Sequence, residues 1–172
     1  ANFANGIQRL DADGFQVGNA NTVNTNGVTY HYAAFALHLT AEASISSAAN
    51  QVFVKGDPST AISPITVTDA ATPTITAGND IRIRIPYWFN MTWDTSVTTA
   101  VITGGAAGKV STTVSYENMG KILVLDVTSN FLSSESITFS GLRFTNFSAK
   151  SYPDNLELEV LNDDAVTSTD DK

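Results

Sequence analysis

The feature of this sequence that most constrains its fold is the strict alternation of isoleucine and arginine in residues 81–85, IRIRI. Successive side chains of a strand point to opposite faces, so the isoleucines share one face and the arginines share the other. The pattern predicts a half-buried strand. Pro86 follows directly, and because proline has no backbone N–H to donate, the strand should end there or continue only as an edge.

Similar short stretches recur along the chain with turn residues between them. Residues 6–18, GIQRLDADGFQVG, place two apolar runs around Asp11, Ala12, Asp13 and Gly14, which predicts a hairpin. Valine, isoleucine, threonine and aromatic residues, which favour strands, dominate the other stretches. These predicted strands lie within residues 28–41, 51–58, 61–70, 100–116, 121–127, 136–147 and 155–161.

Spacing of this kind, without helices alternating between the strands, predicts an all-β fold. We expect an antiparallel β-sandwich or jelly roll of about nine to eleven strands. A single domain over residues 1–172 suits this length. Residues 41–50, AEASISSAAN, are the one segment in which a helical turn is plausible, and Gly141 is expected to mark a bulge in its strand.

One long-range pairing follows from the pattern of residues 156–160, LELEV. Their leucines and valine should face inward while Glu157 and Glu159 face outward, which mirrors the isoleucine and arginine pattern. If the two strands are neighbours, Arg82 and Arg84 pair with the two glutamates across the sheet.

Composition restricts the partners of the chain. The formal net charge is -8 and the pI about 4.4, so the field of the molecule repels phosphate backbones and nucleic acid is not an expected partner. No apolar run reaches the length that spans a bilayer, so we expect no membrane insertion. Cysteine is absent, which excludes disulfides and thiolate chemistry. We interpret Ala1 as the product of signal-peptide removal and predict a secreted, extracellular or cell-surface protein, the alternative being an artificially shortened chain.

Nothing in the sequence predicts an enzyme. His31 and His38 lie at odd and even positions of one predicted strand and therefore project to opposite faces. A catalytic histidine needs an orienting partner and a nucleophile, and no motif supplies them. We therefore expect no catalytic residues.

Calcium is the one cofactor that the sequence suggests. Asp11, Asp13 and Gly14 resemble the start of a calcium loop, and Asn19 and the asparagines after it offer further oxygens. The bidentate glutamate that usually closes such a loop is missing, and an ordinary Asp-Gly turn explains the same residues.

Aromatic residues cluster directly after the isoleucine and arginine strand. Exposed side chains of Tyr87, Trp88 and Trp93, beside Asn90 and Asp94, would stack on sugar rings and bind carbohydrate. The alternative is that they cover the core, which we favour for Phe89 and one of the two tryptophans.

Two asparagines and the acidic tail complete the candidate sites. Asn90 and Asn146 stand in N-x-S/T sequons, which are glycosylation sites only in a suitable host. Four aspartates follow the last predicted strand, and we expect most of them to be solvated. They are Asp163, Asp164, Asp170 and Asp171.

An extended terminus added to an open sheet edge gains a row of main-chain hydrogen bonds. Residues 1–10 or residues 162–172 are therefore candidates for a strand that contacts another subunit. We expect the protein to form a homo-oligomer or polymer.

Three stretches, residues 10–35, 77–102 and 120–147, resemble modules of large, repetitive, secreted bacterial surface and matrix proteins. The cysteine-free, threonine-rich sandwich is also similar to the jelly-roll subunits of donor-strand-exchanged extracellular filaments, such as TasA-like matrix fibres and archaeal bundling pili. Both resemblances imply a non-enzymatic structural subunit that assembles into a filament, tube or surface layer by strand addition. The alternative is a carbohydrate-binding or adhesive module, with polysaccharide as partner and calcium as a further ligand.

Overall fold

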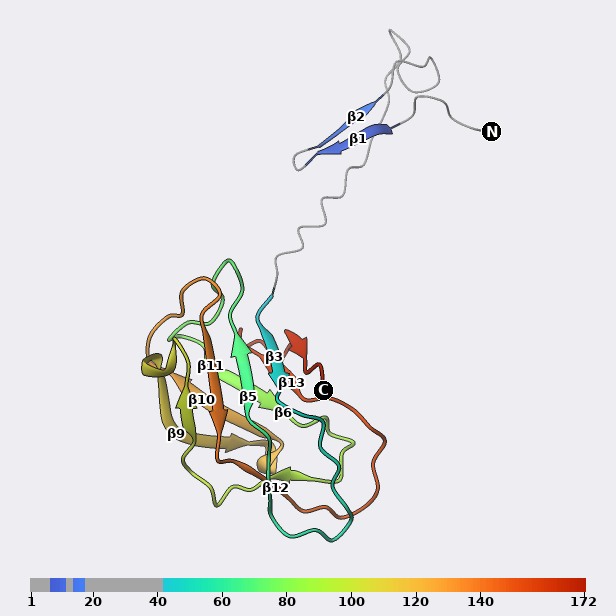
Figure 1. Ribbon diagram of the computed structural model, residues 1–172, viewed down its shortest axis with the longest axis vertical. Helices are drawn as coiled ribbons and strands as arrows, with labels where there is room; N and C mark the ends of the chain where they lie inside the picture. The colour runs from blue at the N-terminus through green and yellow to red at the C-terminus, as the bar shows by residue number, and fades with distance from the viewer. Residues whose placement is uncertain (1–6, 12–13, 18–41) are drawn as a thin grey trace, which may run out of the picture. The chain divides into compact units, whose positions relative to one another are not determined.

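The computed structural model of the chain describes residues 7–11, 14–17 and 42–172 (Figure 1). The chain divides into two compact units, Ala1–Leu39 and Thr40–Lys172. A single domain over residues 1–172 stays a prediction.

The described part of the first unit is a two-stranded antiparallel sheet. Strands β1 (Ile7–Asp11) and β2 (Gly14–Val17) pair Leu10 with Phe15 and Asp11 with Gly14, and the register shifts by a bulge between Ile7 and Arg9. The hairpin predicted around Asp11 to Gly14 is confirmed. The predicted strand of residues 28–41, with His31 and His38, lies outside the described residues.

The second unit contains one larger and two smaller antiparallel sheets. The five-stranded sheet has the order β14-β13-β6-β10-β9. Its strands are β6 (Ile81–Arg84), β9 (Val110–Glu117), β10 (Ile122–Val127), β13 (Glu157–Glu159) and β14 (Ser168–Thr169). Strand β10 lies between β6 and β9, and five of its six residues are buried, so both of its faces are covered, as its apolar sequence predicts.

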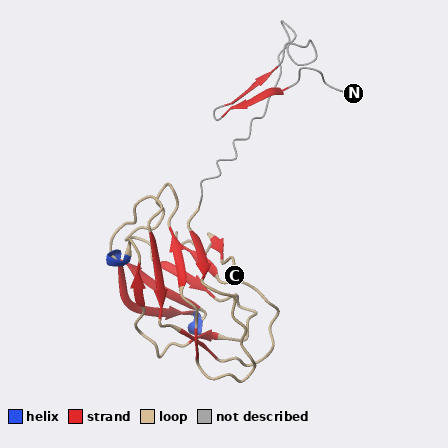
Figure 2. Ribbon diagram, viewed as in Figure 1, coloured by secondary structure: helices blue, strands red, loops and turns tan. Residues whose placement is uncertain are grey.

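The other two sheets have the orders β3-β5-β11-β8 and β4-β12-β7. The four-stranded sheet contains β3 (Ser44–Ser47), β5 (Ile65–Thr68), β8 (Val101–Thr103) and β11 (Ser136–Ser140). The three-stranded sheet contains β4 (Thr60–Ala61), β7 (Thr92–Trp93) and β12 (Arg143–Thr145). The described helices are two short 3-10 turns, η1 (Ala107–Lys109) and η2 (Asn118–Gly120) (Figure 2).

The prediction of an all-β fold is confirmed, and the three antiparallel sheets are consistent with a β-sandwich. Twelve strands form these three sheets, more than the expected nine to eleven, because short two-residue strands join their edges. No helix in the described part of the chain is long and apolar enough to cross a membrane.

One continuous hydrophobic core joins the sheets. Ile83 of β6, Leu125 of β10, Val67 of β5 and Phe139 of β11 are all fully buried in it. Removing an aliphatic side chain of this kind from water contributes about 1.5–3 kcal/mol. The alternation of β6 therefore has the predicted outcome, because its isoleucines lie in this core.

The predicted pairing of β6 with β13 is confirmed: Arg84 lies opposite Glu157 and Arg82 lies opposite Glu159. The ion pair, however, is diagonal, from Arg84 to Glu159. Arg82 instead contacts Glu117 of β9, at 3.3 Å from Nε to Oε2.

The expectation that Glu159 faces solvent is wrong, since 1% of its surface is exposed. Arg84 covers it, and the backbone N–H of Asp164 donates to its Oε1 at 3.1 Å. A buried carboxylate needs such partners, because an unpaired one is costly to desolvate.

Two further expectations are corrected. The helical turn predicted within residues 41–50 is strand β3, because Ala43 and Ile45 alternate into the core and the strand pairs with β5. Gly141 does not mark a bulge within one strand. It adopts a φ of +83° between β11 and β12 and so marks the point where the chain moves from one sheet to another.

Three of the four tail aspartates, Asp163, Asp164 and Asp171, are exposed, as expected for most of them, and Asp170 is the exception. Strand β14 pairs with β13, and Asp170 is 4% exposed. Its carboxylate accepts hydrogen bonds from the backbone N–H of Ser47, at 2.8 Å, and from the Ser47 hydroxyl. In this structure the C-terminal strand is therefore paired within its own chain.

Candidate functional site

The aromatic residues that follow β6 separate into core and surface. Trp93 is 1% exposed and its indole Nε1–H donates to the carbonyl of Ile83 at 3.2 Å. Trp88 is 48% exposed and stands edge-on to Tyr87, with ring centroids 4.9 Å apart. The two tryptophans therefore share no flat surface, and one of them belongs to the core, as the favoured alternative predicts.

The polar residues of the predicted carbohydrate site support loops. Asp94 accepts hydrogen bonds from the hydroxyls of Ser59 (2.5 Å) and Ser96 (2.6 Å), and the Ser59 bond is the main reason that its pKa lies below the ordinary range. Asn90 is bound to Lys150 and Ser151. The hydrogen bonds of Asn90 hold the loops after β6 and β12 side by side.

The two sequons differ in accessibility. The Asn90 side-chain nitrogen donates to the carbonyl of Lys150 and to Ser151 Oγ, both at 3.2 Å, so modification there requires breaking these bonds. Asn146 is exposed with a φ of +59°, and its nitrogen donates to Thr92 Oγ1 at 3.0 Å.

The predicted calcium site falls mostly outside the described part of the chain. Asp13 and Asn19 lie outside the described residues, and Asp11 ends β1. Within the residues that the structure describes, no three histidine or acidic side chains converge as a metal site would require.

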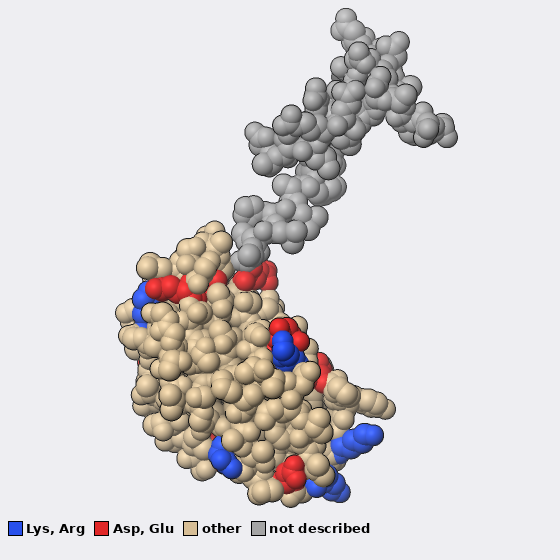
Figure 3. Space-filling view, viewed as in Figure 1, with Lys and Arg blue, Asp and Glu red and all other residues tan. Residues whose placement is uncertain are grey.

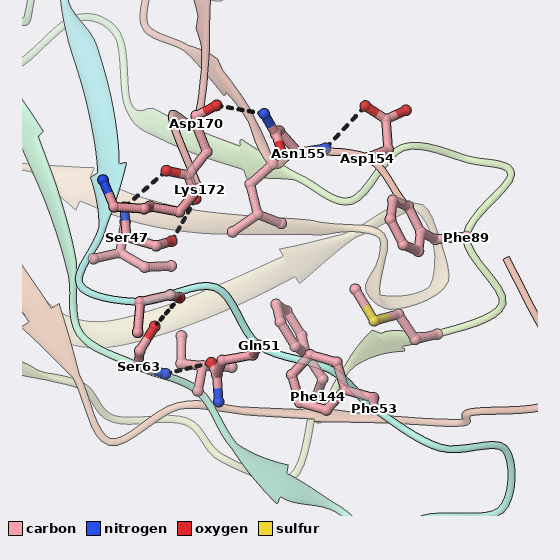
Figure 4. Close-up of a pocket in the computed structure, with 15 residues that line it drawn as sticks. Ser47, Gln51, Phe53, Ser63, Phe89, Phe144, Asp154, Asn155, Asp170 and Lys172 are labelled. Carbon is pink, nitrogen blue, oxygen red and sulfur yellow. Dashed lines mark hydrogen bonds between the residues drawn. The ribbon is translucent and has the colours of Figure 1, made fainter. Parts of the chain in front are cut away.

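The most developed hollow lies between residues 49–55 and residues 147–156, and we call it the lateral groove. It consists of two adjoining hollows of about 420 Å³ and 90 Å³ that share Gln51, Phe53, Phe89 and Met91. Figure 4 shows the smaller one, with Phe53 and Phe144 on one side and Asp154 and Asn155 on the other.

The floor of the lateral groove is aromatic and apolar. Phe53 stacks on Phe147, with centroids 5.0 Å apart, and meets Phe144 edge-on at 5.5 Å. Phe89 and Met91 pack against the core from the other side. Lys121 fixes this side, because its ammonium donates to the carbonyls of both residues, and burial lowers its pKa.

Hydrogen bonds join the two walls at either end of the groove. At one end Asp170 bonds Ser47, and at the other end the N–H of Gly56 donates to the carbonyl of Phe147 at 2.9 Å. Between these contacts, no backbone hydrogen bond among the described residues joins residues 49–55 to residues 149–156. The two walls of the groove are thus not joined by main-chain pairing along its length.

The wall formed by residues 51–54 looks like a strand without a partner. The sequence predicts a strand here, and the side chains do alternate: Val52 is 92% exposed, Phe53 packs on the core, and Val54 is 63% exposed. The segment nevertheless belongs to none of the sheets. The prediction of a strand at this place is therefore wrong: no other segment among the described residues pairs with residues 51–54, and the N–H and carbonyl of Val54 are bonded to Asp57 in a turn.

Two lysines, Lys55 and Lys150, lie at the rim of the groove. Within residues 42–172 the structure gives neither ammonium a hydrogen bond or an ion pair, whereas the remaining lysines and arginines there all have one. Those are Arg82, Arg84, Lys109, Lys121, Arg143 and Lys172. Charges are sparse over most of the face in Figure 3, so a pair of free lysines beside exposed apolar side chains is distinctive.

Sequence reasoning did not identify the lateral groove. The available signal was the apolar run of residues 52–54 next to Lys55, but the second wall lies about a hundred residues further along the chain.

No protein-family model, no curated protein and no solved structure matches this chain. The lateral groove and its surroundings are therefore interpreted from their own chemistry.

Proposed function

We propose that this protein is a non-enzymatic, secreted structural subunit, built as a jelly roll, that assembles with its own copies into an extracellular filament, tube or layer. The lateral groove receives an extended segment of a neighbouring copy. The observation that carries this proposal is the wall of residues 51–54, which alternates like a strand and has no partner strand.

Strand addition explains the chemistry of the groove. An incoming segment gains main-chain hydrogen bonds along an unpaired wall, while its alternate side chains fill hollows. The floor of Phe53, Phe89 and Met91 offers such hollows to apolar side chains. The exposed Val52, Val54 and Tyr152 would be covered, and clusters of exposed apolar residues of this kind mark interaction sites.

The first unit supports the same proposal. Its described sheet consists of β1 and β2, and a two-stranded sheet by itself is at best marginally stable in water. Pairing with a further strand would stabilise it. A chain that offers an unpaired wall and a two-stranded sheet has the elements that strand addition requires.

The test is to measure the assembly state of the full chain by sedimentation velocity and electron microscopy over a range of concentrations. Val52→Asp places a charge where the incoming strand would pack and should abolish assembly. Leu132→Asp is the matched control, because Leu132 is 64% exposed and lies outside the groove. A wild-type chain that stays monomeric at every concentration and ionic strength would refute the proposal.

Carbohydrate binding is the second candidate, and the exposed pair of Tyr87 and Trp88 supports it. Titration with soluble polysaccharides should then change the fluorescence of Trp88. The response should disappear in Trp88→Ala, whereas Val52→Asp should retain it. Absence of any response in the wild type would count against this candidate.

A further inference from the structure

A second apolar surface with the opposite charge lies away from the lateral groove. Leu161 and Val166 are 48% and 44% exposed around a hollow of about 260 Å³ that Glu42 and Asp163 also line. We call this surface the acidic end. Within the described residues neither carboxylate forms an ion pair with a lysine or arginine.

The acidic end and the lateral groove lie at opposite ends of two short strands, β3 and β13. Glu42 and Ala43 precede β3 and line the acidic end, whereas Ala49 and Gln51 follow β3 and line the groove. β13 runs the other way, because Leu156 before it lines the groove and Leu161 after it lines the acidic end. Each strand therefore spans from one surface to the other.

The two surfaces are complementary. The groove rim has Lys55 and Lys150 beside Val52, Val54 and Tyr152, with Asp154 and Lys172 in its smaller hollow, and the acidic end has carboxylates beside apolar side chains and no lysine or arginine among the described residues that line it. Opposite charges around apolar patches steer association and fix its orientation. Two different patches on one molecule form a heterologous contact, which continues into an open row when the rotation does not close.

We propose that the acidic end of one copy docks on the lateral groove of the next, so that the copies assemble head to tail; this inference rests on the self-assembly proposed above.

Charge reversal on the full chain tests the proposal. Lys55→Glu/Lys150→Glu makes the groove rim acidic, and Glu42→Lys/Asp163→Lys makes the opposite end basic. Each variant alone should associate roughly tenfold or more weakly than the wild type in sedimentation velocity, because like charges then meet. An equimolar mixture should recover association, since the acidic groove rim of one variant then meets the basic end of the other, and the unaltered groove meets the unaltered acidic end. Wild-type association should also weaken at high salt.

Net charge provides an internal control. Glu42→Lys/Asp163→Lys is a change of +4, from a formal charge of -8 to -4, so general repulsion between copies decreases. Repulsion alone would make this variant associate more strongly, whereas the proposal requires weaker association.

Asp126→Lys, an exposed change of the same kind on β10, should leave association at the wild-type level. Because Asp163 accepts a hydrogen bond from the Ala165 N–H, its replacement also affects folding. Thermal melts measure that effect, and the single variant Glu42→Lys tests docking without it.

The outcomes distinguish the two proposals. If the wild type and both charge variants assemble equally while Val52→Asp does not, the head-to-tail contact is refuted and strand addition stands. A mixture that associates no better than its components refutes the contact as well. If the wild type does not assemble at all, the proposed function itself fails.

Discussion

The carboxylate of Asp170 binds both the backbone N–H and the hydroxyl of Ser47, which stands 123 residues earlier in the chain. This contact links the end of β3 to the segment after β14, and so connects the edges of the five-stranded and four-stranded sheets. It also marks one end of the lateral groove, since beyond it no backbone hydrogen bond among the described residues joins residues 49–55 to residues 149–156.

Replacement of Asp170 should therefore destabilise the protein. Asp170→Ala leaves the buried N–H of Ser47 without an acceptor, which costs about 1–3 kcal/mol. Chemical denaturation measures the loss. Asp171→Ala is the matched control, because Asp171 is exposed and its bond to the Ser46 hydroxyl lies at the surface. Equal effects of the two substitutions would contradict the assigned role of Asp170.

The buried ion pair of Arg84 and Glu159 should be sensitive to removal of one partner. Arg84→Ala leaves a carboxylate that is 1% exposed without its counter-ion, at a cost of about 3–5 kcal/mol. Arg84→Met/Glu159→Leu should be less destabilised than Arg84→Ala, since both charges are then absent. Glu117→Ala removes a half-exposed partner of Arg82 and should cost about 1 kcal/mol or less. Urea denaturation of the four proteins provides the comparison.

The two tryptophans should respond differently to substitution and to quenching. Trp93→Ala removes a buried ring and its hydrogen bond to Ile83, and should cost about 3–5 kcal/mol. Trp88→Ala should change stability by about 0.5 kcal/mol or less. Acrylamide should quench the fluorescence of Trp88 and leave that of Trp93 nearly unchanged in the folded protein. Equal quenching of both would show that Trp93 is accessible.

Stability should fall in acid partly through Asp94. Hydrogen bonds from Ser59 and then Ser96 lower the pKa of Asp94 in the folded state below its ordinary 3.8. A group with a lowered folded pKa stabilises the fold above its unfolded pKa, and this contribution disappears as the pH falls through the folded pKa. The stability difference between the wild type and Asp94→Asn should therefore shrink between about pH 5 and pH 2. A difference that is constant with pH would contradict this assignment.

Much of the fold is predictable because strand signals are local. The alternation of residues 81–85 fixes which side chains enter the core, since the period of a strand is two whatever its neighbours are. Turn residues likewise predict the hairpin of β1 and β2, where Asp11 pairs with Gly14. The matching pattern of Glu157 to Glu159 even identifies the neighbouring strand.

Other properties depend on residues far apart in the chain. Nothing local distinguishes Trp88 from Trp93, yet one is at the surface and the other lies against Phe144 of β12. Asp170 resembles the other tail aspartates in the sequence, and its burial is due to Ser47.

The β class, the core-facing side of each regular strand and the tight turns can be read from local sequence, because they depend on neighbours a few residues away. Which strands have partners depends on contacts between distant segments. Residues 51–54 have the pattern of a strand, but a strand exists only when another chain segment supplies its hydrogen bonds. The absence of such a segment within the described residues opens the lateral groove.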